Sequence, residues 1–187
     1  MKQNKLINMC AINLMLMAGL SVSSVQASDV SYNYLEGRYI VDAEANNVDG
    51  DGLRIGGSVR IRSDLYLFSN YETLDLDFNN DIDTFNLGGG YILPLNAKWD
   101  ANFSMALVNR DVNNNDDTGF SLAAGVRGMM ASNIEGRASL TYIDVNDNDT
   151  YITLGGDYFF SKNLSVGIEA DLSGDLDTLS IGARYHF

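Results

Sequence analysis

The sequence predicts an all-β protein, an antiparallel meander β-barrel of ten strands that crosses a membrane. Apolar and polar residues alternate with a period of two, which is typical of a strand with different surroundings on its two faces. Ten such segments follow one another, and their connections alternate in kind. After residue 27 no apolar run is long enough for a membrane helix. A chain that spans a membrane without helices must form a closed barrel, because only closure pairs every backbone group in lipid.

The first 27 residues have the features of a secretory signal peptide. Two lysines precede an apolar stretch from about Met9 to Val22, and Val25-Gln26-Ala27 has the small-residue spacing of a signal-peptidase site. The apolar stretch is shorter than the roughly 20 residues that a membrane helix needs. We therefore expect cleavage after residue 27 and one domain, the barrel, over residues 28–187.

Composition narrows the functional classes. Removal of the two lysines of the signal peptide leaves 10 basic residues of 12 against 25 acidic ones, a net charge of −15. Such a charge argues against nucleic acid as a partner. The only cysteine, Cys10, lies in the signal peptide, so we expect neither a disulfide nor a thiol in the exported chain.

The alternation is clearest in a segment whose apolar set is Leu53, Ile55, Gly57, Val59 and Ile61 and whose polar set is Arg54, Gly56, Ser58, Arg60 and Arg62. Similar patterns cover residues 85–93, 99–107, 120–126, 136–142, 152–160, 164–172 and 179–187. Aromatic residues leave the facing ambiguous in the segments near 30–42 and 65–74. Eight strands remain an alternative if the first and last segments pair differently. Each segment is about as long as the 9–11 residues of a tilted membrane strand.

The connections alternate between tight turns and regions that we expect to be longer loops. The tight ones are Arg62-Ser63-Asp64, Pro94-Leu95-Asn96, Ala131-Ser132-Asn133 and Ser161-Lys162-Asn163. The longer ones, rich in Asp and Asn, lie near residues 43–51, 75–83, 111–118, 145–150 and 173–177. Short turns belong on the periplasmic side of such barrels and long loops outside. A soluble lipocalin-like barrel or sandwich is the alternative, but the small and charged residues of the polar set favour a narrow lumen surrounded by lipid.

The C-terminus carries a second indication of the outer membrane. Gly182, Tyr185 and the terminal Phe187 resemble the signal by which the outer-membrane assembly machinery recognises barrels. The alternation turns Tyr185 and Phe187 toward lipid, and Arg184 and His186 inward. We expect this segment to close the barrel against the first strand.

The segment Ser31-Tyr32-Asn33-Tyr34-Leu35-Glu36-Gly37-Arg38-Tyr39, the Asp-rich connections and the ending Arg184-Tyr185-His186-Phe187 together resemble a family of small porin-like outer-membrane barrels. The resemblance covers residues 28–187. The chain is most similar to small barrels whose production is linked to diffusible-signal quorum sensing in plant pathogens, and more distantly to the OmpX and OmpA transmembrane barrels. Those two have eight strands rather than ten. The family has no assigned reaction, so the resemblance implies no catalytic residue.

Charged residues are expected to divide by depth. Eighteen of the 25 acidic residues fall in the windows 42–51, 72–83, 111–117, 144–149 and 171–177, which contain no Lys or Arg. We expect the lumen to hold a network of arginines and carboxylates, Glu36, Arg38, Arg54, Arg60, Arg127, Glu135, Arg137, Asp157, Glu169 and Arg184. In a narrow barrel such a network is the usual way to satisfy buried charges. Small inward residues such as Gly155, Gly167 and Gly182 either admit the long arginines or leave a pore open.

The acidic regions also suggest weak binding of divalent cations. Asn47, Asp49 and Asp51 place oxygen atoms at alternate positions before a glycine, as in the first half of an EF-hand loop. Ser58 stands where the bidentate Glu of that loop is expected, and strands rather than helices flank the segment. Solvated acidic loops are therefore the simpler interpretation.

An enzyme is disfavoured, because His186 is the only histidine and no cysteine lies beyond the signal peptide. We expect a structural or surface-interaction protein of the outer membrane of a Gram-negative bacterium, with acidic extracellular loops. A narrow passive pore for small solutes or cations is the alternative, and an outer-membrane hydrolase a distant one. We expect no cofactor beyond weakly bound calcium or magnesium. The expected partners are outer-membrane lipid, lipopolysaccharide and the barrel assembly machinery, and the expected state is a monomer.

Overall fold

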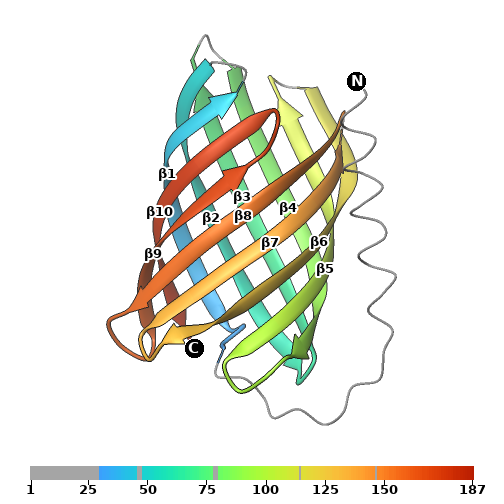
Figure 1. The fold of residues 1–187 in the computed structure, drawn as a ribbon. Helices are drawn as coiled ribbons and strands as arrows, with labels where there is room; N and C mark the ends of the chain where they lie inside the picture. Colours follow the sequence, from blue (N-terminus) through green and yellow to red (C-terminus); the bar gives the residue numbers. More distant parts are fainter. Residues whose placement is uncertain (1–29, 46–47, 78–79, 114, 146) are drawn as a thin grey trace.

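The protein is a closed barrel of ten antiparallel strands (Figure 1). The computed structural model describes residues 30–45, 48–77, 80–113, 115–145 and 147–187. The strands are β1 (Tyr34–Ala45), β2 (Val48–Arg62), β3 (Leu65–Leu76), β4 (Asn80–Pro94), β5 (Trp99–Val112), β6 (Asn115–Ala131), β7 (Ile134–Val145), β8 (Asp147–Phe159), β9 (Leu164–Leu172) and β10 (Leu176–His186). The predicted fold and its ten strands are confirmed. The signal peptide lies outside the described residues and stays a prediction.

Each strand pairs with its neighbours in the chain, and the barrel closes where β1 pairs with β10. At this seam Tyr34 lies opposite His186 and Arg38 lies opposite Gly182. The register of β1 shifts after Ile40, so the bulge turns Val41 outward and Ala43 inward. We call the end where β1 begins, β10 ends and the four tight turns lie the terminal end, and the opposite end the distal end.

The outer surface of the barrel is apolar, as the alternation predicted. Outward residues of β2 from Leu53 to Ile61 are apolar or glycine, and many large apolar side chains on other strands are exposed in the same way. Near the distal end two outward tyrosines donate hydrogen bonds to carboxylates. The Tyr39 hydroxyl lies 2.6 Å from Asp51 Oδ2 and the Tyr71 hydroxyl 2.9 Å from Asp83 Oδ1. Such amphipathic rings typically mark the boundary between the apolar and the hydrated part of a membrane barrel.

The expectation of long acidic loops at the distal end is wrong. β1 ends at Ala45 and β2 begins at Val48, and the other distal connections are comparably short. The strands continue through the Asp-rich regions, because ladder pairing satisfies their backbone groups whatever the side chains are. The acidic residues therefore stand mainly on strand ends that form a rim. The described residues contain no helix that is long and apolar enough to cross a membrane.

The inward residues change in character from the terminal to the distal end. In β7 the inward order is Glu135, Arg137, Ser139, Thr141, Ile143 and Val145, and β3 runs in a similar way from Tyr66 through Asn70 and Glu72 to Leu74 and Leu76. The interior thus has an aromatic zone at the terminal end, an ionic zone in the middle and an apolar zone at the distal end.

Candidate functional site in the barrel lumen

All ten residues that the sequence placed in the lumen lie on inward positions of their strands. Nine of them, all except Arg60, join one set of ion pairs and hydrogen bonds, together with Glu72 and Asp171. We call this set of five arginines and six carboxylates the ionic network. Every strand except β4 and β5 contributes to it. Arginine side chains suit such a position because each guanidinium presents several donors to more than one carboxylate.

Arg54 is the distal anchor of the ionic network. Its guanidinium lies 2.5 Å from Glu72 Oε2, 2.7 Å from Glu169 Oε1 and 2.8 Å from Asp171 Oδ2. Thr153 donates a further hydrogen bond of 2.6 Å to Asp171. Glu169 also accepts a hydrogen bond of 2.8 Å from Arg137 Nε, so it links the distal part of the network to the middle.

Asp157 and Glu36 hold the middle of the network together. Asp157 pairs with Arg137, with Arg38 at 3.6 Å and with Arg184 at 3.5 Å. Glu36 pairs with Arg184 at 2.9 Å and with Arg38 at 3.2 Å. Because the Asp157 side chain is only 2% exposed, these three arginines replace the water that would otherwise solvate it.

At the terminal end of the network Arg127 binds Glu135 with two hydrogen bonds, of 2.5 and 3.2 Å. Arg184 also lies 3.7 Å from Glu135 and so connects this pair to the rest. Both partners of the bidentate pair are buried. The opposite charges of Arg127 and Glu135 therefore compensate each other at the boundary between the ionic zone and the aromatic zone.

Several of these contacts cross the lumen between strands that are not neighbours. Arg54 on β2 reaches Glu169 and Asp171 on β9, across the seam strands β1 and β10. Arg38 on β1 reaches Asp157 on β8, and Arg184 on β10 reaches Glu135 on β7. The network therefore spans the interior rather than lining one wall of it.

Glu72 and Asp171 were predicted to belong to the outer acidic regions, and that prediction is wrong. Both side chains point inward and bind Arg54. For Asp171 the signal was present, because Leu164, Val166, Ile168, Ala170 and Leu172 form the outward set of the same strand. For Glu72 no such signal was present, because the facing of the third strand was ambiguous.

Arg60 points inward but has a different role from the other arginines. Its Nη2 donates to the backbone carbonyl of Val30 at 3.2 Å, and its guanidinium carbon lies 5.1 Å from the centroid of the Tyr32 ring. The backbone N–H of Arg60 donates to Asn33 Oδ1 at 2.7 Å. Arg60 thus fixes the segment that precedes β1 inside the terminal mouth.

We call this segment, Val30–Asn33, the N-terminal plug. Val30 and Tyr32 are each only 3% exposed, and they pack with Tyr66 and Ile92. The Tyr32 ring lies 4.9 Å from the Tyr66 ring and also 5.1 Å from the guanidinium carbon of Arg127. Burial raises the pKa of the Tyr32 hydroxyl, so the ring stays neutral between two arginines. Nothing in the alternation of the strands predicted this plug.

The distal part of the lumen is filled by apolar side chains. One cluster consists of Ile40, Ala43, Leu74 and Leu76, and a second of Val108, Ile143 and Val145. Ile40, Leu74 and Val108 have no exposed surface at all. The apolar zone was not predicted, because small and charged residues were the ones expected to face the lumen.

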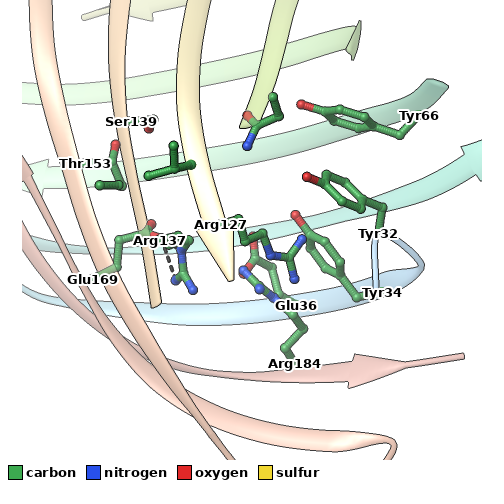
Figure 2. Close-up of a pocket in the computed structure, with 13 residues that line it drawn as sticks. Tyr32, Tyr34, Glu36, Tyr66, Arg127, Arg137, Ser139, Thr153, Glu169 and Arg184 are labelled. Carbon is green, nitrogen blue, oxygen red and sulfur yellow. Dashed lines mark hydrogen bonds and ion pairs between the residues drawn. The ribbon is translucent and has the colours of Figure 1, made fainter. Parts of the chain in front are cut away.

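Two polar cavities remain beside the ionic network, of about 200 and 150 Å³. Tyr34, Glu36 and Tyr66 border both of them. In Figure 2, Tyr32, Tyr34 and Tyr66 stand on one side of the larger cavity, while Arg137, Glu169, Thr153 and Ser139 stand on the other. Each cavity has room for several water molecules next to polar groups that can bind them.

Inward glycines make room for the long side chains of the network. A Cβ atom on Gly155 would lie 2.7 Å from the Arg137 guanidinium, and one on Gly182 would lie 2.5 Å from the carbonyl oxygen of Gly37 and from Cγ of Arg38. Of the two interpretations that the sequence left open, the structure therefore favours admission of the arginines.

The Ser165 hydroxyl and His186 Nε2 form a pair at 3.2 Å that was not predicted from the sequence. Ser165 has no exposed surface and His186 is 4% exposed. Among the described residues His186 Nδ1 has no hydrogen-bond partner, so no carboxylate orients the ring as a catalytic triad requires. Phe159 packs on the imidazole with a centroid distance of 5.0 Å. The pair is a packed element of the terminal end.

The suggested cation site is only partly described. Asn47 lies outside the described residues, and Asp49 and Asp51 lie on outward positions of β2 rather than in a loop. Within the described ranges, no group of three or more His, Cys, Asp or Glu side chains is arranged to hold a metal ion. Weak binding of calcium or magnesium stays a prediction.

Comparison with protein-family models finds no match, and neither does a search of curated proteins. Solved structures do match. The KdgM porin is 14% identical with a TM-score of 0.50, over 82% of this chain and 99% of the porin. An outer-membrane channel from Pseudomonas putida F1 is 9% identical with a TM-score of 0.50, over 89% of this chain and 100% of the channel.

The β-domain of the Bordetella autotransporter BrkA is 13% identical with a TM-score of 0.52, over 83% of this chain and 99% of that domain. At these identities the similarity is one of fold. All three structures are outer-membrane barrels or domains of that type, and the strand pattern, the apolar exterior and the charged lumen of this chain agree with them. The chain therefore has the fold of the small porin-like outer-membrane β-barrels.

Proposed function

We propose that the protein is a closed, non-conducting barrel of the Gram-negative outer membrane that acts through its surface. The observation that carries this proposal is the filling of the lumen at three successive depths. The N-terminal plug occupies the terminal mouth, the ionic network bridges the middle, and two apolar clusters fill the distal part. A hydrated ion would have to displace packed side chains at every depth.

The distal rim is the proposed interaction surface. Exposed carboxylates stand there on both sides of the short connections, among them Asp49, Asp75, Asp81, Asp116 and Asp175, and the rim's described residues include no exposed lysine or arginine. Weakly held calcium or magnesium ions would bridge these carboxylates to the phosphates of lipopolysaccharide. Lipid, lipopolysaccharide and the assembly machinery are the partners that we propose, with a monomeric barrel.

A narrow passive pore is the second candidate, and the two polar cavities are the observation in its favour. If the N-terminal plug and the apolar clusters move aside, the cavities join the two mouths. We assign no reaction to the protein, because its Ser165–His186 pair is buried and has no orienting carboxylate among the described residues.

Planar-bilayer recording separates the two candidates. The refolded protein is expected to insert without discrete conductance steps, because side chains fill the lumen at three depths. Insertion must be verified independently by protection from protease in vesicles of the same lipid. Reproducible single-channel steps from an inserted, folded sample would refute the closed barrel and establish the pore.

The contribution of the N-terminal plug is testable with two substitutions at one position. Tyr32→Ala removes the ring between Arg60, Arg127 and Tyr66 and is expected to cost about 3 kcal/mol in the free energy of unfolding. Tyr32→Phe keeps the ring and removes a hydroxyl that has no hydrogen-bond partner among the described residues, so it should change stability by less than about 0.5 kcal/mol. Urea unfolding in detergent micelles measures both. Equal stabilities for the two variants would show that the plug does not pack in the lumen.

A further inference from the structure

The exposed basic residues of the barrel are confined to its terminal end. Ten lysines and arginines lie beyond the signal peptide, and seven of them are arginines on inward strand positions. The other three, Arg62, Lys98 and Lys162, are exposed. Arg62 is the last residue of β2, Lys98 lies between β4 and β5, and Lys162 lies between β8 and β9, so the three mark three of the four tight connections. We call these three side chains the basic ring.

Little negative charge opposes the basic ring. Asp64 is the one partly exposed acid of the four tight turns, and it lies 3.4 Å from Arg62. Asp100 and Glu135, at the terminal end of β5 and β7, are buried. The ring therefore has a net positive charge, whereas the distal rim is strongly negative.

Outward aromatic residues adjoin the basic ring and set its depth. Trp99 directly follows Lys98, and Phe160, which is 63% exposed, precedes Lys162 by two residues. Phe187 and Tyr185 stand on the neighbouring strand end and are also exposed. Rings of this kind lie at the level of lipid headgroups, where their apolar body meets the acyl chains.

Lys98 and Lys162 also border one hollow in the terminal mouth. It has a volume of about 650 Å³, and Ser132, Asn133 and Ser161 line it as well. The Glu135 carboxylate also lines the hollow, but it is paired with Arg127. The hollow therefore gives a phosphate headgroup space beside two lysines and several hydrogen-bonding side chains.

From the charge, the depth and the hollow we infer that the basic ring binds the phosphate groups of anionic phospholipids in the leaflet around the terminal end. A lysine or arginine close to a surface of anionic lipid increases the affinity for that surface by about fivefold. Three such residues therefore enrich anionic lipid around the terminal end several-fold over its share of the bilayer. The acidic rim repels the same lipids, so the two ends of the barrel select different leaflets.

Trp99 is the only tryptophan of the chain, and it reports on this leaflet directly. The protein is refolded in equimolar phosphatidylglycerol and phosphatidylcholine, with bromine on the acyl chains of one lipid and then of the other. Bromine quenches tryptophan only at short range, so the ratio of the two quenching values gives the lipid composition next to Trp99. We expect at least a twofold preference for phosphatidylglycerol, which decreases in high salt as screening requires.

A triple variant, Arg62→Gln, Lys98→Gln and Lys162→Gln, is expected to abolish the preference. The matched control, Asp75→Asn, Asp81→Asn and Asp175→Asn at the distal rim, should leave it unchanged, which separates a local ring from an effect of net charge. Equal quenching in the reciprocal mixtures, or a preference that survives in the triple variant, would overturn the inference. Loss of the preference on addition of inorganic phosphate at matched ionic strength would show a free-ion site and would also overturn it. The result does not depend on whether the lumen conducts.

Discussion

Arg54→Ala is expected to lower the free energy of unfolding by about 3 kcal/mol or more, because it leaves inward carboxylates without their cation. Glu72 and Asp171 have Arg54 as their arginine partner in the ionic network, at 2.5 and 2.8 Å, and their side chains are 16% and 13% exposed. Glu169 still pairs with Arg137 in this variant, so it loses less of its electrostatic stabilisation. Urea unfolding of the refolded protein in detergent micelles, followed by far-UV circular dichroism, measures the change.

Arg62→Ala is the matched control for this experiment. Arg62 is on the same strand and also pairs with an aspartate, but its side chain is 68% exposed. Exposed pairs contribute little, so we expect a change within about 0.5 kcal/mol. A loss for Arg54→Ala as small as that for Arg62→Ala would mean that water already solvates the carboxylates, and the filled lumen would be refuted.

Gly182→Ala is expected to destabilise the closure of the barrel by about 2 kcal/mol, since overpacking at a rigid position costs 1–3 kcal/mol. The new Cβ would lie 2.5 Å from the carbonyl oxygen of Gly37 and 3.0 Å from the Cα of Arg38, which are backbone atoms that cannot rotate away. The strain falls on the seam between β1 and β10. The slower electrophoretic migration of the unfolded form, recorded after heating to successive temperatures, reports the loss.

Gly37 provides the control on the partner strand. Its Cβ position has no heavy atom within 4 Å, so Gly37→Ala should leave stability unchanged or raise it slightly. Refolding in detergent needs no assembly machinery, which separates packing at Gly182 from any part it has in the assembly signal. If both substitutions have the same effect on unfolding, β1 and β10 do not approach each other as closely at Gly182 as the structure indicates.

The sequence predicted the barrel because the period of two is a local property of each strand. Leu53 to Ile61 alone fix the facing of β2, and with it the inward position of Arg54. The same alternation placed Arg184 and His186 inside and Tyr185 outside. Which arginine meets which carboxylate was not predictable, because those contacts join strands far apart in the chain and depend on the shear of the closed barrel.

Other features of the structure were not predicted from the sequence, for different physical reasons. The Asp-rich windows are typical of loops, yet neighbouring strands pair through them, since pairing depends on backbone groups more than on side chains. The N-terminal plug lies before the first strand, where no periodicity indicates that Tyr32 packs against Tyr66. The apolar interior at Ile40 and Val108 contradicted the simple rule that polar residues face the lumen.

The ion pairs across the lumen also constrain the order in which the barrel folds. Arg54 and Asp171 are 117 residues apart, and Arg184 and Glu36 are 148 apart. Hairpins that form early gain none of this energy, because their partners join only when the last strands arrive. Contacts of such long range slow the approach to the native state and make its completion cooperative. A half-formed sheet therefore holds unpaired charges that favour water, and only closure makes the whole cylinder compatible with the bilayer.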